Sequence, residues 1–421
     1  MRGFSFLKYW LALGCLLAGL LPTGAAHAQT LPAVPTMPEV ALDSVQVAPQ
    51  AVDISGWLLL DKDIQLELGG AVQNMYNFKF DKAEKQFRSL RRRYPQHPMA
   101  YFLLSLSNCW KMMPNSVSDT RYDKVFLAYA DTAEAKAEAL YKADNRNYEA
   151  CFFLAGAYGL EARLHAERHN WRKATVAARR SLNYLEKSKE ANGLSADFLF
   201  GQGLFNYYAV WIGQEYPWLR PVLFFFPKGN REQGLSQIRQ AARAAFYTGT
   251  EASSFLVTIL DSDREHQPAA AYQVAQQLAI KFPDNPYFEL NYAKLAFKQG
   301  NMVESEQACR SVLRKYAVGQ VGYEAYSCRP AAYIMGYLMQ HKYRDVPQAK
   351  DYFQRCIVYS EQSGATRRGY YVFAQASLAR LAVYERNEPA ARRYYRTIVE
   401  QTDTGQVEYD EARAWLRTHR Q

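Results

Sequence analysis

The sequence predicts an all-α protein whose antiparallel helix pairs, about eight of them, stack as a solenoid. From Gly56 onward, apolar residues recur with helical periodicity. Strand signals, meaning short alternating runs bounded by Asn-Gly or Asp-Gly turns, are nearly absent. One spacing of small and large apolar residues also returns along the chain, which is typical of a repeat architecture rather than of several separate cores.

The first 28 residues predict a secretory signal peptide. Arg2 and Lys8 precede an apolar stretch over residues 9–21, and a small-residue cleavage site follows at 26–28. Removing this segment lowers the formal net charge from +10 to +8. Cys15 follows a glycine, as at lipoprotein processing sites, so lipidation of Cys15 stays open as an alternative.

Residues 29–51 contain four prolines and little apolar periodicity, which predicts a disordered tether ahead of a solenoid over 52–421. No later run approaches the ~18 apolar residues that a membrane span needs. We therefore expect an exported protein in the periplasm or at the outer surface.

The composition excludes a disordered or collagen-like chain. Apolar residues make up 49% of the sequence, with 31 Tyr and 22 Phe, which is enough apolar surface for a large core. The cysteines after residue 28 are odd in number and lack the C-x-x-C spacing of a zinc or redox site. They are predicted to be small core residues: Cys109, Cys151, Cys309, Cys328 and Cys356.

The repeated spacing places a small residue, a larger apolar residue four positions later and another three positions after that. All three fall on one helical face, and the small residue lets a neighbouring helix approach closely. Copies of this pattern begin at Ala83, Ala133, Ala174, Gly234, Ala271, Ser305, Ala349 and Ala391.

A preceding helix in most copies carries an apolar residue followed by a small one, as at Tyr292 and Ala293. From Ala271 to Ser305 the pattern repeats after 34 residues, with Gly300 at the turn between helices. In these features the chain resembles the tetratricopeptide repeat family. The resemblance covers roughly residues 60–400 and implies a right-handed superhelix with a concave, protein-binding face.

In the family's register, certain positions of each first helix point into the groove. The resemblance implies partner-binding side chains at Phe102, Trp110, Phe152, Phe198, Phe205, Tyr287, Lys294, Phe297, Lys298, Tyr333, Tyr337, Arg380 and Tyr384. The same residues could instead pack neighbouring helices together. Some grooves of this family clamp a terminal carboxylate, but Leu290 takes a position that such a clamp fills with a polar residue, so that activity is not expected here.

An aromatic insertion at about 209–230 contains three prolines and two glycines, which forbid a long regular helix. Contiguous apolar residues in such a segment favour contact with a partner or a membrane surface. The alternative is that they fill a gap between helix pairs. The candidate residues are Trp211, Tyr216, Trp218, Phe224, Phe225 and Phe226.

Catalytic motifs are lacking, so we predict no enzyme and no cofactor. His165 and His169 lie four residues apart with Glu161 one turn earlier, but the sequence is not H-E-x-x-H, and a solvated helix face is the simpler interpretation. Basic runs near Arg91 and Arg393 could meet a polyanion. The export signal argues against nucleic acid.

The sequence thus predicts a non-enzymatic scaffold of the bacterial envelope that presents an aromatic groove to a protein or an extended peptide. Two alternatives remain. Aromatic residues also stack on sugar rings, which would make this a glycan-binding envelope protein. A metal-dependent hydrolase centred on His165 and His169 is the less favoured alternative.

Overall fold

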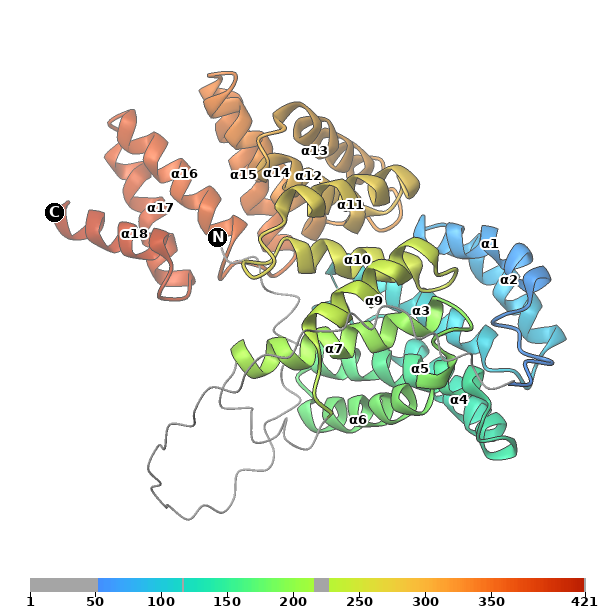
Figure 1. Ribbon diagram of the computed structural model, residues 1–421. Helices are drawn as coiled ribbons and strands as arrows, with labels where there is room; N and C mark the ends of the chain where they lie inside the picture. The colour runs from blue at the N-terminus through green and yellow to red at the C-terminus, as the bar shows by residue number, and fades with distance from the viewer. Residues whose placement is uncertain (1–51, 116, 216–226, 420–421) are drawn as a thin grey trace, which may run out of the picture. The chain divides into compact units, whose positions relative to one another are not determined.

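A computed structural model describes residues 52–115, 117–215 and 227–419, and every regular element within these ranges is a helix (Figure 1). This confirms the all-α prediction. The predicted signal peptide and tether lie outside the described residues. So do Tyr216, Trp218, Phe224, Phe225 and Phe226 of the aromatic insertion.

The chain divides into two compact units. The first comprises the described residues within 1–62, 96–102 and 130–249, and the second those within 63–95, 103–129 and 250–421. The first unit holds most of α4 (Asp123–Ala143) and the whole of α5 (Tyr148–Glu167), α6 (Trp171–Lys187), α7 (Asp197–Glu215) and α9 (Arg231–Ala244).

The second unit holds the helices at the start of the described chain and those after residue 250. They are α1 (Lys62–Tyr76), α2 (Phe80–Arg93), most of α3 (Met99–Met112), α10 (Gly249–Leu260), α11 (Pro268–Lys281), α12 (Pro286–Lys298), α13 (Met302–Ala317), α14 (Ala325–His341), α15 (Val346–Gln362), α16 (Tyr370–Tyr384), α17 (Glu388–Gln401) and α18 (Val407–Thr418).

The repeated spacing predicted from the sequence forms a fully buried stripe in α2, α9, α11, α13, α15 and α17. In α11, Ala271, Ala275 and Leu278 are buried, and the corresponding residues of α2, α13, α15 and α17 are buried as well. Each copy presents one apolar stripe that must be covered by the next helix. The prediction that these positions are buried is confirmed.

Small residues bring helices into close contact where the sequence places them. A Cβ atom added to Gly336 of α14 would lie 2.6 Å from the Phe353 ring of α15. A Cβ atom added to Gly234 of α9 would lie 2.5 Å from the backbone nitrogen of Tyr207 in α7. Such distances leave no room for a side chain, so glycine is needed for the pairing of these helices.

In the second unit each helix from α11 to α18 packs on the next one along the chain, and α12, α14, α16 and α18 also contact one another. We call these four helices the even-helix row. No pair among α11, α13, α15 and α17 has contacts as extensive within the described ranges. Side chains on the even-helix row therefore lie on adjacent helices and can form one continuous surface.

The helix pair at the start of the second unit packs against a segment over 200 residues later in the chain. The Asn285 side chain is fully buried, caps α12 by accepting the backbone N–H groups of Tyr287 and Phe288, and donates to the Tyr76 carbonyl at 2.7 Å. Lys79 also pairs with Asp284 at 3.2 Å. A linear solenoid has contacts only between neighbouring repeats, and no local sequence pattern indicates this one.

Candidate functional site

Predicted groove residues of the first unit form a ladder of aromatic rings. The Phe152 ring of α5 lies 6.4 Å from that of Phe102 and 5.6 Å from that of Phe198, centroid to centroid. Phe102 and Phe152 are half-buried, whereas Phe198 is buried. Phe205, two turns further along α7, is half-buried. The ladder joins neighbouring helices, and Phe102 and Phe152 retain exposed area.

Trp211 is the member of the predicted aromatic insertion that the structure describes. It lies in the last part of α7, is 7% exposed, and has its ring 6.1 Å from that of Tyr208. The ring is therefore part of the packing of the first unit.

Trp110, another predicted groove residue, is buried in an aromatic cluster of the second unit. Its ring lies 5.1 Å from Tyr76, 5.2 Å from Phe288 and 6.2 Å from the half-buried Tyr287, and its Nε1 atom donates to Glu251 at 2.5 Å. Only 1% of the side chain is exposed. Trp110 thus offers no surface to a partner in this structure.

The even-helix row brings other predicted residues together at its surface. Phe297 of α12 lies 5.0 Å from Tyr337 of α14, and Tyr333 of α14 lies 5.6 Å from Tyr370 and 5.8 Å from Phe373 of α16. All five residues are half-buried, so each keeps part of its surface accessible. Aromatic rings held in this way are typical anchors for a bound chain.

Two cations lie on the same helices as these rings. Lys294 precedes Phe297 by three residues in α12, and Arg329 precedes Tyr333 by four residues in α14, so each cation shares a helical face with its aromatic neighbour. Burial lowers the pKa of Lys294 to about 8, a net shift in which the charge of Asp261 opposes burial and the charge of Arg329 adds to it. The two cations are therefore close enough to repel each other.

Arg329 owes its position to the proline that follows it. Pro330 lies inside α14 and has no N–H to donate to the carbonyl of Tyr326, one turn earlier. The Arg329 side chain supplies donors instead, from Nε to Tyr326 O at 3.4 Å and from Nη1 to Ala365 O at 3.3 Å. The side chain is only 8% exposed, and its guanidinium group lies over the Tyr326 ring.

The remaining predicted residues of this row lie at its edges. Exposed Lys298 pairs with Asp261 at 2.5 Å, and Arg380 of α16 donates from Nε to Glu411 at 2.9 Å. Tyr384, at the end of α16, is 85% exposed. Lys298 and Arg380 have their charges paired within the chain, whereas Lys294 and Arg329 have no ion pair among the described residues.

Replacing Lys294 by methionine should raise the free energy of unfolding at pH 7 by about 1–2 kcal/mol. This is less than the full pKa shift corresponds to, because the side chain is partly exposed and solvent screens its charge. The folded state lowers the pKa from 10.5 to about 8, so the folded protein binds this proton less tightly than the unfolded chain. The charged Lys294 therefore destabilises the folded protein by its full amount below pH 8, and this destabilisation disappears as the pH rises to 10.5.

Urea unfolding at pH 7 and above pH 10.5 measures this effect, and Lys85→Met is the control because Lys85 is exposed on α2. The control should change stability by less than about 0.5 kcal/mol. Equal stabilisation by Lys294→Met at both pH values would contradict the expectation.

Within the described ranges, no group of three His, Cys, Asp or Glu side chains is arranged to hold a metal ion. His165 is buried, with Nε2 at 3.1 Å from Glu161, whereas His169 is exposed with a φ of 58° and its ring 5.3 Å from Trp171. The two histidines therefore do not face a common ion in this structure.

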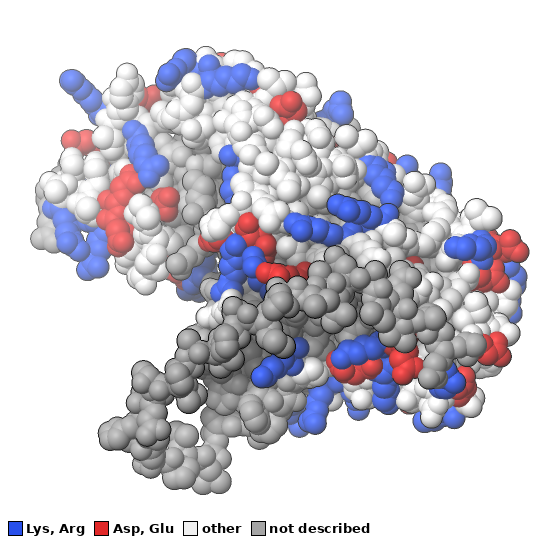
Figure 2. All heavy atoms as spheres, viewed as in Figure 1, with Lys and Arg blue, Asp and Glu red and all other residues white. Residues whose placement is uncertain are grey.

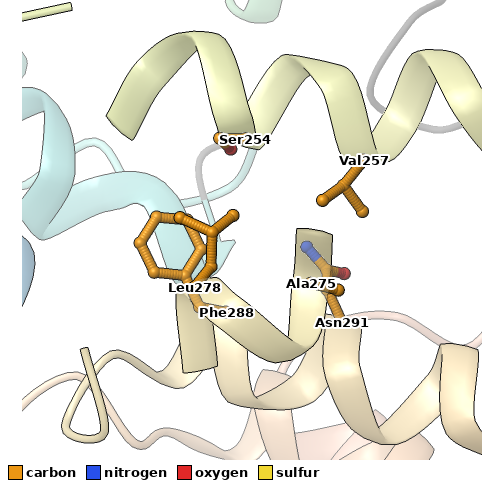
Figure 3. Close-up of a pocket in the computed structure, with 6 residues that line it drawn as sticks. All are labelled: Ser254, Val257, Ala275, Leu278, Phe288 and Asn291. Carbon is orange, nitrogen blue, oxygen red and sulfur yellow. The ribbon is translucent and has the colours of Figure 1, made fainter. Parts of the chain in front are cut away.

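A crevice between α10, α11 and α12 is lined mainly by apolar side chains, with Ser254 and Asn291 beside them, and is too narrow to admit a water molecule (Figure 3). Ser254 and Val257 line one side of it, and Leu278 and Phe288 the other. This crevice is a packing gap and not a small-molecule site.

None of the helices that the structure describes is both long and apolar enough to cross a membrane.

The basic run on α2 is partly neutralised by ion pairs. Arg88 pairs with Glu84 at 2.5 Å, and Arg93 pairs with Glu67. Acidic and basic side chains are interspersed over the face that Figure 2 shows.

All five predicted core cysteines are buried, which confirms that prediction. Burial raises the pKa of the Cys309 thiol to about 12.

Sequence reasoning missed Arg329, Tyr370 and Phe373, which complete the surface of the even-helix row. Arg329 is the only Lys or Arg within α14, and α14 contains no acidic residue. A lone cation in an apolar helix was a usable signal. Tyr370 precedes the positions that were counted as groove-facing, so spacing did not identify it. Phe373 stands six residues before Ala379, as Tyr287 does before Ala293, so the same spacing could have identified it.

The described residues thus define an all-α protein of helical, repeat-like architecture with an aromatic and cationic face on alternate helices. No family model matches the chain. No curated protein matches it either.

Proposed function

We propose that this protein is a non-enzymatic binding scaffold that holds a protein or an extended peptide against the even-helix row. The observation that carries the proposal is the set of half-buried rings on α12, α14 and α16, from Phe297 through Tyr333 to Phe373. Rings that are packed on one side lose little side-chain entropy when a partner covers the other side.

The proposal includes the finer architecture implied by the family resemblance, in which the helix pairs form a right-handed superhelix with the even-helix row on its concave side. Contacts between alternate helices support this, because helices on the inside of a curved stack lie closer together than those on the outside. It also includes export, with the protein acting in the periplasm or at the outer surface, on the strength of the signal-like residues 1–28.

Site-specific photo-crosslinking in intact cells tests the proposal. A photoreactive phenylalanine replaces Tyr384 or Tyr337 on the even-helix row, and Val303 on α13 or Val358 on α15 as matched positions on the other helices. We expect discrete protein adducts in the envelope fraction from the first two positions and none from the other two.

Equal adducts from both sets, or adducts only with cytosolic proteins, would contradict the proposal. An absence of protein adducts, together with slower migration through a gel that contains polysaccharide, would instead favour the glycan-binding alternative.

A further inference from the structure

The even-helix row contains two neighbouring cations whose hydrogen-bonding capacity the chain does not use up. A guanidinium group has five N–H donors, and the bonds of Arg329 to Tyr326 O and Ala365 O involve only Nε and Nη1. Neither Nη2 of Arg329 nor Nζ of Lys294 has a hydrogen bond or an ion pair among the described residues. Both groups are therefore free to donate to a bound molecule.

Asp261, the acidic residue whose charge acts on Lys294, does not by itself neutralise the pair. Asp261 attracts Lys294 electrostatically, but its carboxylate is 2.5 Å from Nζ of Lys298. Counting Lys294, Lys298 and Arg329 against Asp261, this part of the row carries a net charge of about +2 at neutral pH. The repulsion between the partly buried charges of Lys294 and Arg329 destabilises the folded protein, and a bound anion would offset this repulsion.

The rings beside the cations limit what kind of anion fits. Phe297 and Tyr337 form one aromatic pair and Tyr333 packs on Tyr370, so apolar surface lies directly next to the two charges on α12 and α14. A small inorganic anion would leave these rings exposed. An extended peptide would cover both features, because alternate side chains and the backbone could lie on the rings while one side chain reaches the cations.

We propose that Lys294 and Arg329 bind the carboxylate of an Asp or Glu side chain within an extended segment of the partner protein. This inference rests on the proposed function and specifies the chemistry of the partner. Charge-assisted hydrogen bonds from Arg and Lys to a carboxylate are about twice as strong as neutral ones, which gives selectivity for an acidic residue over its amide.

A peptide array tests the inference with the full chain. Peptides of about nine residues are long enough to cross three neighbouring helices when extended. Each is synthesised in two forms, with Glu or its isostere Gln at the centre, and both ends are capped so that no terminal carboxylate is present. Peptides that retain the protein are then measured in solution by fluorescence anisotropy.

We expect the Glu form to bind about tenfold more tightly than the Gln form, which corresponds to about 1.4 kcal/mol. Lys294→Met should reduce this ratio to near one, and Arg329→Gln should do the same if it folds. Arg314→Gln is the matched control, because it removes one positive charge from an exposed position on α13 and should leave the ratio unchanged. In the unaltered protein the ratio should fall as the pH rises from 7 to 10 and Lys294 loses its proton.

The possible failures can be told apart. Peptides that bind equally well in both forms would overturn the carboxylate site and leave the scaffold function standing. Binding only to peptides with an uncapped C-terminus would overturn the assignment to a side chain. If folded protein retains no peptide at all, both the inference and the proposed peptide-binding function are contradicted.

Discussion

Replacing Asp197 by alanine should destabilise the first unit by about 3–5 kcal/mol. The Asp197 carboxylate is 2% exposed at the start of α7 and accepts backbone N–H groups from Phe246 at 3.1 Å, Tyr247 at 2.9 Å and Thr248 at 2.8 Å. The Thr248 hydroxyl donates to it as well, at 3.0 Å. One side chain thus holds the segment that leads into α10, and its loss leaves several buried donors without an acceptor.

Urea unfolding monitored by circular dichroism measures the change, and amide hydrogen exchange of residues 246–248 shows whether it is local. Asp144→Ala is the matched control in the same unit, because the exposed Asp144 accepts a single backbone N–H, from Arg146 at 2.9 Å. The control should cost less than about 1 kcal/mol. A loss below 1 kcal/mol for Asp197→Ala, with unchanged exchange at residues 246–248, would show that the carboxylate does not support this segment.

The repeating part of the fold could be predicted from the sequence because its determinants are local. Ala391, Tyr395 and Ile398 fall on one face of a helix whatever else the chain does, and all three are buried in α17. The same holds for Ser305, Cys309 and Val312 in α13, although serine and cysteine are less obvious core residues. In each case the spacing, and not the residue type alone, carried the prediction.

Contacts between distant segments could not be predicted in this way. Asp197 and Asn285 are short polar residues that a sequence analysis assigns to helix starts, and both do lie at helix starts. What they also bind, residues 246–248 for Asp197 and Tyr76 for Asn285, depends on tertiary packing. The repeat pattern does not indicate that residues 246–248 will donate to the Asp197 carboxylate.

The candidate site was predicted in part. Counting positions from the repeat placed Phe297, Tyr333 and Tyr337 on adjacent helices, where the structure also has them. The same counting also placed the buried Trp110 in the groove. A position in the repeat determines which face of a helix a residue lies on, but it does not determine whether another part of the chain covers that face. Arg329 was missed since its side chain is directed by the break in hydrogen bonding at Pro330, which is a structural and not a periodic effect.

Truncation of Trp110 distinguishes the groove and core interpretations. Trp110→Ala should destabilise the second unit by about 3–5 kcal/mol, the usual cost of removing a large buried aromatic side chain. The change removes the ring contacts with Tyr76 and Phe288 and takes the Nε1 donor away from Glu251. If Trp110 instead acted at a binding surface, its loss would weaken partner binding and leave stability nearly unchanged.

The comparison variant is Tyr384→Ala, which removes an aromatic side chain that is 85% exposed on α16. It should change the free energy of unfolding by less than about 0.5 kcal/mol, as expected for an exposed residue. Chemical unfolding and photo-crosslinking yield, measured on both variants, then separate the two roles. A stable Trp110→Ala protein that fails to bind would place the partner at Trp110, whereas an unstable one assigns Trp110 to the core and leaves the half-buried rings of the even-helix row, Phe297, Tyr333 and Tyr337 among them, as the proposed contacts.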